Sequence, residues 1–230
     1  MPTPDDLLLR HGPGVRLVHA IDALTVLVLS VTGLAVSGDL PLAWSGWLGG
    51  HERLNATHQL LGIWFVGIAL LWSLARLPVA WRFLRRIFRF GRDDARWLPR
   101  YVLHLATPLR HAPPRCDGYF DPGQRLVFIG ILATMLLAGA SGTYLYAWSP
   151  QMPWAAWIGP MIRLHIASTW LLMALLTVHI LAGSGLLWTH RGLVRTMFGD
   201  GRVTPALAER LWPDWASTRQ EEQRRDRSRR

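Results

Sequence analysis

Four apolar stretches, each of about 20 residues or more, dominate the sequence. The hydrocarbon core of a bilayer is about 30 Å thick, so an α-helix of about 20 apolar residues crosses it. Half of the 230 residues are hydrophobic, and with these long stretches the chain is too apolar for a soluble domain. The sequence therefore predicts an all-α protein with a bundle of four transmembrane helices. The four stretches are Leu17–Val36, which we interpret as a retained helix and not a signal peptide, Leu54–Leu77, Leu126–Trp148 and Ile162–Trp188.

The charge is strongly one-sided. The net charge is +10, and every basic residue is Arg. Of the 25 arginines, 11 lie between Arg76 and Arg125 and 10 follow Trp188. The positive-inside rule then places both termini and the middle loop in the cytoplasm, and this distribution argues against a nucleic-acid partner. Tryptophans near the two remaining loops are typical of an aromatic belt at the outer interface: Trp44, Trp47, Trp148, Trp154 and Trp157.

These features divide the chain into three parts. Residues 1–16 form a cytoplasmic N-terminus, residues 17–188 a membrane domain with a basic cytoplasmic loop at 78–125, and residues 189–230 an Arg-rich cytoplasmic tail. Aromatic and basic residues alternate within Arg82–Arg115, so part of this loop is expected to lie on the membrane surface as an amphipathic helix. The end of the tail, Arg219–Arg230, is expected to be disordered and attracted to anionic membrane lipid or a partner.

The last apolar stretch carries two histidines, His165 and His179, fourteen residues apart. In one α-helix this spacing is about 21 Å along the axis, with both side chains within about 40° of a common face. An imidazole inside a membrane is costly unless it is paired. Two stacked haems, each needing a second axial ligand, would pair both rings.

Two further histidines supply the second ligands. His19 lies near the start of the first stretch and His58 near the start of the second. The alternating helix directions put His58 at the depth of His165 and His19 at the depth of His179. We therefore expect an outer haem between His58 and His165 and an inner haem between His19 and His179. One such histidine alone is more simply a cap or a core residue; four at two matched depths favour haem.

Other residues refine this hypothesis. The single cysteine, Cys116, allows no Cys-x-x-Cys-His attachment, so the haems are expected to be non-covalent and b-type. Small residues could give a porphyrin backbone clearance or merely pack the helices. They are Gly33, Gly62, Gly130, Gly139 and Gly142. The remaining histidines, which fall in termini or loops and receive no ligand role, are His11, His51, His104, His111 and His190.

Several motifs together resemble the membrane cytochrome b (gamma) subunit of respiratory formate dehydrogenase. This subunit is one of the four-helix dihaem cytochromes b that also serve nickel–iron hydrogenases and thiosulfate reductases. The run before the third helix and the tail resemble the formate dehydrogenase type most. The motifs are Arg16-Leu-Val-His19 with Thr32-Gly33, His58 to Gly62, Asp93 to Leu98, Tyr119 to Arg125, His165, Val178-His179-Ile180, Arg191-Gly192, Arg195 to Gly199 and Trp215.

The resemblance implies a function in the bacterial inner membrane. Electrons from formate would pass through a molybdenum or tungsten catalytic (alpha) subunit and an iron–sulfur (beta) subunit to the outer haem, the inner haem and quinone, either menaquinone or ubiquinone. The chain would have no formate oxidation chemistry of its own. It implies a quinone pocket at His179 and the turn Asp121, Gly123 and Gln124.

The sequence departs from this family pattern at three places. Asp121 stands where Asn is common, and it could relay a proton or cap a helix at Pro122. Leu181 replaces a tyrosine, and Leu211-Trp212 replaces two histidines. Asp22, one turn after His19, could handle protons or stay hydrated near the interface. The alternatives are a cytochrome b for a hydrogenase or a sulfur-compound reductase, and a haem-free anchor or transporter.

Overall fold

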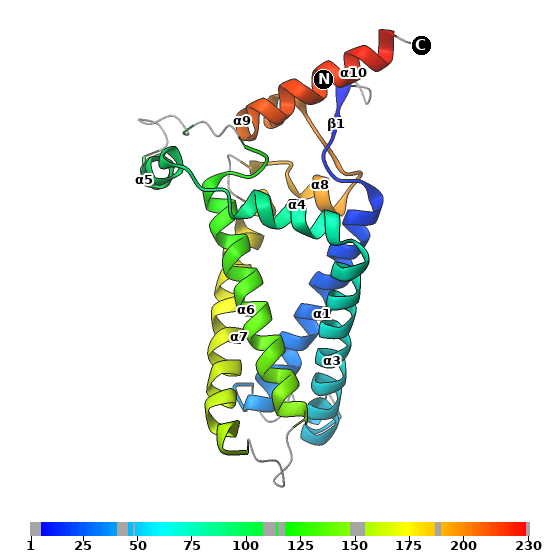
Figure 1. Ribbon diagram of the computed structural model, residues 1–230, viewed down its shortest axis with the longest axis vertical. Helices are drawn as coiled ribbons and strands as arrows, with labels where there is room; N and C mark the ends of the chain where they lie inside the picture. The colour runs from blue at the N-terminus through cyan, green and yellow to red at the C-terminus, as the bar shows by residue number, and fades with distance from the viewer. Residues whose placement is uncertain are drawn as a thin grey trace. The chain divides into compact units, whose positions relative to one another are not determined.

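The computed structural model describes residues 6–40, 46–47, 49–107, 114, 118–147, 155–186 and 190–228. Among these described residues, four helices are long and apolar enough to cross a membrane, one for each predicted stretch. The prediction of an all-α, multi-pass membrane protein is therefore confirmed. The four helices are α1 (Pro13–Ser37), α3 (His51–Ala75), α6 (Pro122–Ala147) and α7 (Ile158–Gly183) (Figure 1).

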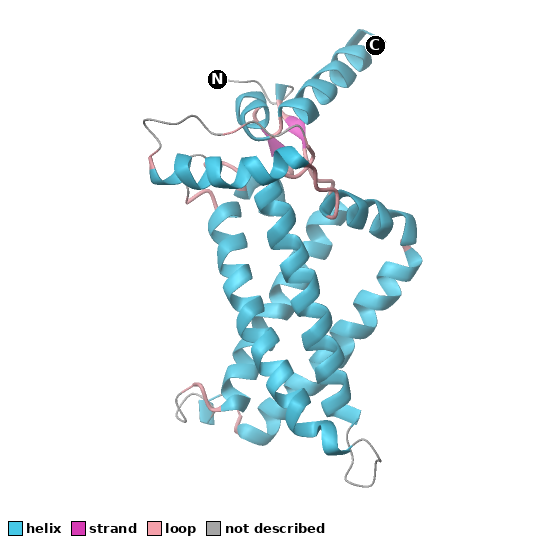
Figure 2. Ribbon diagram, turned by 60° about the vertical axis from the view of Figure 1, so that its left-hand side comes forward, coloured by secondary structure: helices cyan, strands magenta, loops and turns pink. Residues whose placement is uncertain are grey.

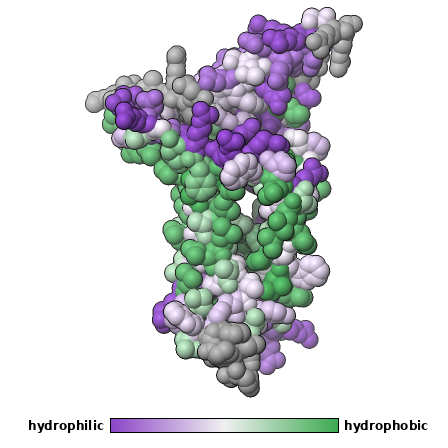
Figure 3. Space-filling view, viewed as in Figure 1, coloured by the Kyte–Doolittle hydropathy of each residue, from purple (hydrophilic) through white to green (hydrophobic). Residues whose placement is uncertain are grey.

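Large apolar side chains on these helices point outward. Leu71 is 68% exposed and Trp64 62% exposed, and Figure 3 shows apolar side chains over the surface of the helices. In water such a surface would be unfavourable, whereas in a bilayer lipid tails cover it. Most of the exposed apolar side chains on these helices thus mark the lipid-facing surface.

The chain forms two compact units. The bundle unit comprises Val18–Ala80 and Gly130–Thr177, and the surface unit comprises Met1–Leu17, Trp81–Ile129 and Val178–Arg230. In the bundle unit, the segments of the four long helices run beside one another (Figures 1 and 2). Gly139 allows close packing, since a Cβ there would lie 3.0 Å from Val66 Cγ2. A short 3₁₀ helix, η2 (Ala155–Trp157), precedes α7.

The surface unit holds most of the remaining helices and a two-stranded antiparallel sheet, drawn in magenta in Figure 2. Strand β1 (Leu8–Leu9) pairs with β2 (Arg202–Val203). Leu8 and Val203 pack with Leu207, Ala208 and Ala216 into a small core. The helices that this unit contains wholly or mostly are α4 (Leu77–Ile87), α5 (Arg92–Ala106), α8 (Val194–Phe198), α9 (Pro205–Leu211) and α10 (Pro213–Ser228).

Arg10 joins the N-terminus to the tail and to the segment before α6. Its guanidinium carbon lies 3.8 Å from the Tyr119 ring centre, 3.9 Å from that of Trp212 and 4.4 Å from that of Trp215. Nη2 of Arg10 also donates to the Tyr119 carbonyl at 2.7 Å. Burial lowers the pKa of Arg10 to about 10, which leaves it charged at neutral pH and able to attract the ring faces.

The structure corrects two expectations. The predicted disorder of Arg219–Arg230 is wrong for the described part of this segment, because helix α10 continues to Ser228. Arg, Gln and Glu are good helix formers. In addition, Ala216 is buried near the start of α10, and Arg219 forms an ion pair with Glu222 at 2.7 Å. His104 and His51 are not loop residues: His104 is buried within α5, and His51 begins α3.

The other expectations for the loops have mixed outcomes. The amphipathic helix predicted within Arg82–Arg115 is observed as α4, although it begins earlier, at Leu77. Of the belt tryptophans, Trp47 is 93% exposed and Trp157 is 59% exposed. Trp44, Trp148, Trp154, Cys116 and His111 lie outside the described residues.

Candidate haem-binding site

His58 of α3 and His165 of α7 meet inside the bundle unit. Their ring centroids are 6.1 Å apart and the ring planes are nearly perpendicular, at 85°. Two metal–imidazole bonds of about 2.0–2.1 Å, plus about 1 Å from nitrogen to ring centre on each side, separate two rings on one metal ion by about 6 Å. The spacing of the two rings therefore suits two axial ligands of one haem iron.

Each histidine contacts a hydroxyl on the neighbouring helix. Nδ1 of His58 lies 3.0 Å from Oγ1 of Thr32 on α1. Nδ1 of His165 lies 3.2 Å from Oγ of Ser141 on α6 and 2.9 Å from the Ala138 carbonyl oxygen. Both rings are therefore held through Nδ1, and Nε2 is the nitrogen available to a metal.

Two glycines give the imidazoles their space. A Cβ at Gly33 would lie 3.1 Å from Cε1 of His58, and one at Gly142 would lie 3.0 Å from Cε1 of His165. Each glycine directly follows the hydroxyl residue of its helix, Thr32 or Ser141. The chain therefore presents a hydroxyl and a cleared backbone side by side.

A cavity of about 510 Å³ lies next to these residues, within the bundle unit. It is lined by both histidines and by four of the five glycines noted in the sequence: Gly33, Gly62, Gly139 and Gly142. The fifth, Gly130, packs against Leu175, which agrees with the alternative that small residues serve helix packing. The rest of the lining is mainly apolar, with side chains such as Leu29, Met135 and Leu172. Two imidazoles in an apolar, glycine-lined cavity fit a non-covalent haem.

The other histidine pair is split between the units. His19 belongs to the bundle unit and His179 to the surface unit, and their pairing stays a prediction. Asp22 of α1 interacts electrostatically with His19. The His179 ring lies 5.8 Å from the Phe128 ring, and Phe128 lies 5.1 Å from Phe120, which precedes Asp121. Aromatic contacts thus link His179 to the turn before α6.

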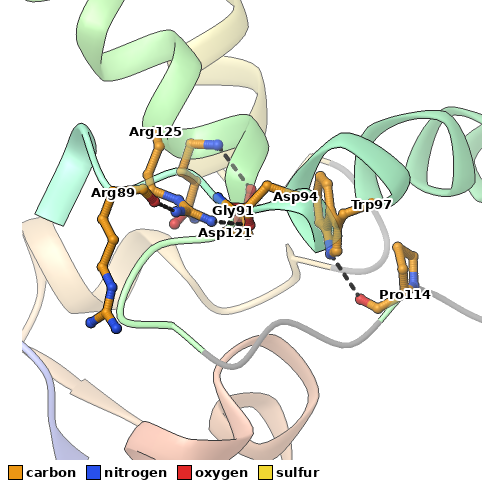
Figure 4. Close-up of polar contacts among 8 residues, drawn as sticks. Arg89, Gly91, Asp94, Trp97, Pro114, Asp121 and Arg125 are labelled. Carbon is orange, nitrogen blue, oxygen red and sulfur yellow. Dashed lines mark hydrogen bonds and ion pairs between the residues drawn. The ribbon is translucent and has the colours of Figure 1, made fainter.

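In that turn, Asp121 caps helix α6 (Figure 4). Its Oδ1 accepts a hydrogen bond from the Gln124 backbone N–H at 2.8 Å. Gly123 keeps the turn tight, because a Cβ there would lie 3.2 Å from Asp121 Oδ1 and 3.4 Å from Cζ3 of Trp97. Of the two roles considered for Asp121, the cap is the one observed. Burial raises the pKa of Asp121, against the opposing effects of the Gln124 and Gly123 backbone and of Arg125.

An ion pair connects helix α5 to the first turn of α6. Arg125 Nη2 lies 2.5 Å from Asp94 Oδ1, and Arg125 also donates to the Arg89 carbonyl. Asp94 in turn accepts from the Gly91 N–H at 2.7 Å (Figure 4). Burial and the nearby Asp121 carboxylate together raise the pKa of Tyr101 to about 12. The proposed quinone turn is therefore surrounded by ordered polar and aromatic groups.

A family model described as prokaryotic cytochrome b561 matches residues 10–200, which is most of the chain. The chain belongs to the prokaryotic cytochrome b561 family. This cytochrome is therefore a membrane electron-transfer protein that binds b-type haem. A comparison with curated proteins gives no match.

Sequence reasoning about this cytochrome missed Ser141 and Ala138 and gave Thr32 no role. An internal repeat could have found them. Helices α1 and α6 both begin with Pro-Gly-x-Arg-Leu-Val, at Pro13–Val18 and Pro122–Val127. Aligned on this start, Thr32-Gly33 coincides with Ser141-Gly142.

Proposed function

We propose that this cytochrome is the membrane subunit of a respiratory formate dehydrogenase. It would hold two b haems and pass electrons from an iron–sulfur subunit, supplied by a molybdenum or tungsten catalytic subunit, to quinone. The nearly perpendicular rings of His58 and His165, 6.1 Å apart beside a glycine-lined cavity, carry the haem part of the proposal. The inner bacterial membrane is its proposed location.

The formate dehydrogenase assignment is supported by two segments that occur together. The run from Tyr119 to Arg125 and the tail ending at Trp215 resemble that subunit. In the surface unit both segments contact the same side chain, since Tyr119 and Trp215 lie on the Arg10 guanidinium. The two resembling segments thus meet at one residue, which is the arrangement expected if both serve one function.

For the haems, the chain would provide ligands and exclude water. Bound haem iron supplies a one-electron redox centre. His58 and His165 would each offer Nε2 at one site, and His19 and His179 would do so at the other. The apolar lining of the His58–His165 cavity keeps water away and thereby tunes the site.

For quinone, we propose the turn Asp121, Gly123 and Gln124 together with His179. Gln124 can donate a hydrogen bond to a quinone oxygen, and Gly123 lets the ring approach the backbone. Asp121 can hold a proton, because burial raises the pKa of its carboxyl. Protons would then be taken up from the cytoplasm at the start of α6.

The second candidate is a cytochrome b of a hydrogenase or a sulfur-compound reductase. Leu181 and Leu211-Trp212 favour it, since these positions depart from the formate dehydrogenase pattern. Trp212 is 3% exposed and packs on Arg10. A residue that differs from the formate dehydrogenase pattern is therefore part of the packed core of the tail. Membership of a b-haem family argues against the haem-free anchor.

Affinity purification from native membranes tests the assignment. We expect an iron–sulfur and a molybdopterin subunit to co-purify, and formate to reduce the haem bands while hydrogen or thiosulfate leaves them unchanged. A pyridine haemochrome assay should give two haems per chain. Reduction by hydrogen and not by formate would transfer the assignment to the second candidate.

Reporter fusions test the direction of transfer. Fusions after Asp39 and after Gln151 should report the outside, and fusions within Arg82–Arg115 and at the C-terminus the cytoplasm. Any reversal would break the proposed pairing of His58 with His165 and of His19 with His179 at two depths.

A further inference from the structure

We propose that Thr32 and Ser141 are positioning residues that set the tautomer and the rotation of the two imidazoles. Each hydroxyl would accept the Nδ1–H of its histidine, so that Nε2 faces the iron and the ring cannot turn. The inference rests on the proposal that His58 and His165 bind one haem. It adds a role for two residues that neither family membership nor the ligand assignment gives.

The argument is firmest for His165. Its Nδ1 lies 2.9 Å from the Ala138 carbonyl oxygen, and a carbonyl oxygen can only accept a hydrogen bond. Nδ1 must therefore carry the proton. A neutral imidazole has one ring proton, so Nε2 bears the lone pair that a metal needs.

The hydroxyl of Ser141 reinforces this tautomer. Its oxygen lies 2.6 Å from the Leu137 carbonyl and 3.2 Å from the Ala138 carbonyl, so its single proton is directed to the backbone. The oxygen can then only accept from His165, 3.2 Å away. Ser141 is 1% exposed, and the site depends on the chain for its hydrogen bonds.

Thr32 repeats the arrangement at His58. Its hydroxyl donates to the Val28 carbonyl at 2.8 Å and lies 3.2 Å from the Leu29 carbonyl, which leaves the oxygen to accept from His58 Nδ1 at 3.0 Å. The Leu29 carbonyl also bonds the His58 ring, as Ala138 bonds His165. Each half of the site therefore holds its histidine with a back-bonded hydroxyl and a carbonyl one turn before a glycine.

These contacts also fix how the rings are turned. The two hydroxyls approach from different helices, and they hold the ring planes at 85°. In a ferric haem with two imidazole ligands, perpendicular rings give a highly anisotropic low-spin EPR signal, whereas parallel rings give a rhombic one. The EPR spectrum therefore reports on the role of the hydroxyls, independently of electron-transfer activity.

The test compares Thr32→Val and Ser141→Ala with a matched control. Thr32→Val keeps the shape of the side chain, Ser141→Ala removes only the hydroxyl, and each leaves a buried Nδ1–H without its hydroxyl acceptor. Thr134→Val is the control, because Thr134 is 2% exposed on α6 and back-bonds to Gly130 and Ile131 in the same way. Thr32→Ser keeps the hydroxyl and should restore the wild-type properties.

We expect Thr32→Val and Ser141→Ala each to weaken haem affinity at this site by 10- to 100-fold, the usual effect of losing an outer hydrogen bond. The anisotropic EPR signal of this haem should move toward a rhombic one. Its reduction potential should rise, because an imidazole that has lost one of its two Nδ1–H acceptors and keeps only the carbonyl is a weaker donor to ferric iron. The second haem of the same chain reports that each variant is folded.

Unchanged EPR spectrum, potential and affinity in both variants would overturn the inference while leaving the haem assignment intact. The same would follow if Thr134→Val produced the same changes, since the effect would then be one of helix packing. If His58→Ala and His165→Ala keep the full haem content, the proposed ligand assignment itself fails. The two failures are thus separable.

Discussion

The two halves of the bundle, α1 with α3 and α6 with α7, are alike at the His58–His165 site and differ at the proposed His19–His179 site. In the first half, Thr32-Gly33 faces His58; in the second, Ser141-Gly142 faces His165. The likeness ends near the start of α1 and α6. His19 of α1 aligns with Phe128 of α6, although Pro-Gly-x-Arg-Leu-Val precedes both.

This difference suggests a way for one repeat to provide two kinds of site, if the proposed His19–His179 site exists. Where the halves agree, each supplies one histidine, one hydroxyl and one glycine, and the site is symmetric. Where they differ, the His19–His179 site would draw one ligand from each half at positions that are not equivalent. Phe128, at the position that aligns with His19, lies with its ring 5.8 Å from the His179 ring and cannot bind a metal. The asymmetric end also carries Gln124, where α1 has Val15.

The largest expected effect is the loss of a whole haem. His58→Ala or His165→Ala should lower the haem content from two per chain to one, because a single imidazole holds b haem weakly. The double variant should also keep one haem, since both residues serve the same site. His19→Ala or His179→Ala should remove the other haem, with different bands lost in the optical spectrum. A double variant with no haem would show that the two sites are not independent.

Quinone reduction should respond next most strongly. Gln124→Val makes the start of α6 identical to the start of α1, so it removes the polar group that distinguishes the two. We expect quinone to reoxidise the reduced haems at least about ten times more slowly, as for the loss of a positioned polar group. Both haems should remain reducible. Leu126→Ala nearby is a control, and stopped-flow spectra with added quinone are the measurement. A wild-type rate in Gln124→Val would place the quinone site elsewhere.

The four membrane helices could be predicted because apolar length is a property of the sequence alone, and the structure has them within a few residues. The meeting of His58 and His165 followed from helix direction and depth. The order of α10 was missed because local sequence patterns do not show that Trp215 packs on Arg10 or that Ala216 packs with Leu8 of the distant strand β1. The hydroxyl contacts were missed because hydropathy ranks Thr32 and Ser141 as minor polar interruptions.

A third difference between the halves concerns two equivalent arginines. Arg125 is buried and pairs with Asp94 at 2.5 Å, whereas Arg16 lies beside the backbone at Gly201. Arg125→Ala should destabilise the protein by roughly 2 kcal/mol, below the usual cost of breaking a fully buried pair because Asp94 is partly exposed. Arg16→Ala should cost less. Thermal unfolding in detergent measures both, and equal losses would show that the Asp94 pair contributes nothing specific.

Asp121 should make stability depend on pH. Burial raises the pKa of Asp121 in the folded protein above its unfolded value. Its contribution to the stability of the folded protein is therefore fully present at pH values below the unfolded pKa. That contribution is lost as pH rises through the folded pKa. Asp121→Asn keeps an N-cap oxygen but does not titrate. The melting temperature of this variant should therefore change less with pH over this range than that of the wild type. Identical pH profiles for the two proteins would show that Asp121 is not desolvated.

The smallest expected effect tests the symmetry of the His58–His165 site directly. Gly33→Ala and Gly142→Ala would place a Cβ 3.1 Å and 3.0 Å from Cε1 of their respective histidines, so each ring must move by a few tenths of an ångström. A core that tolerates such a shift should keep its haem, with less than about a tenfold loss of affinity and a small change in potential. Gly67→Ala is the control, because a Cβ there meets nothing within 4 Å and alanine favours the helix. Redox titration should give shifts of similar size and the same sign for Gly33→Ala and Gly142→Ala, and none for Gly67→Ala. A shift in only one of the two would mean that the halves hold their histidines differently, despite the shared hydroxyl, carbonyl and glycine.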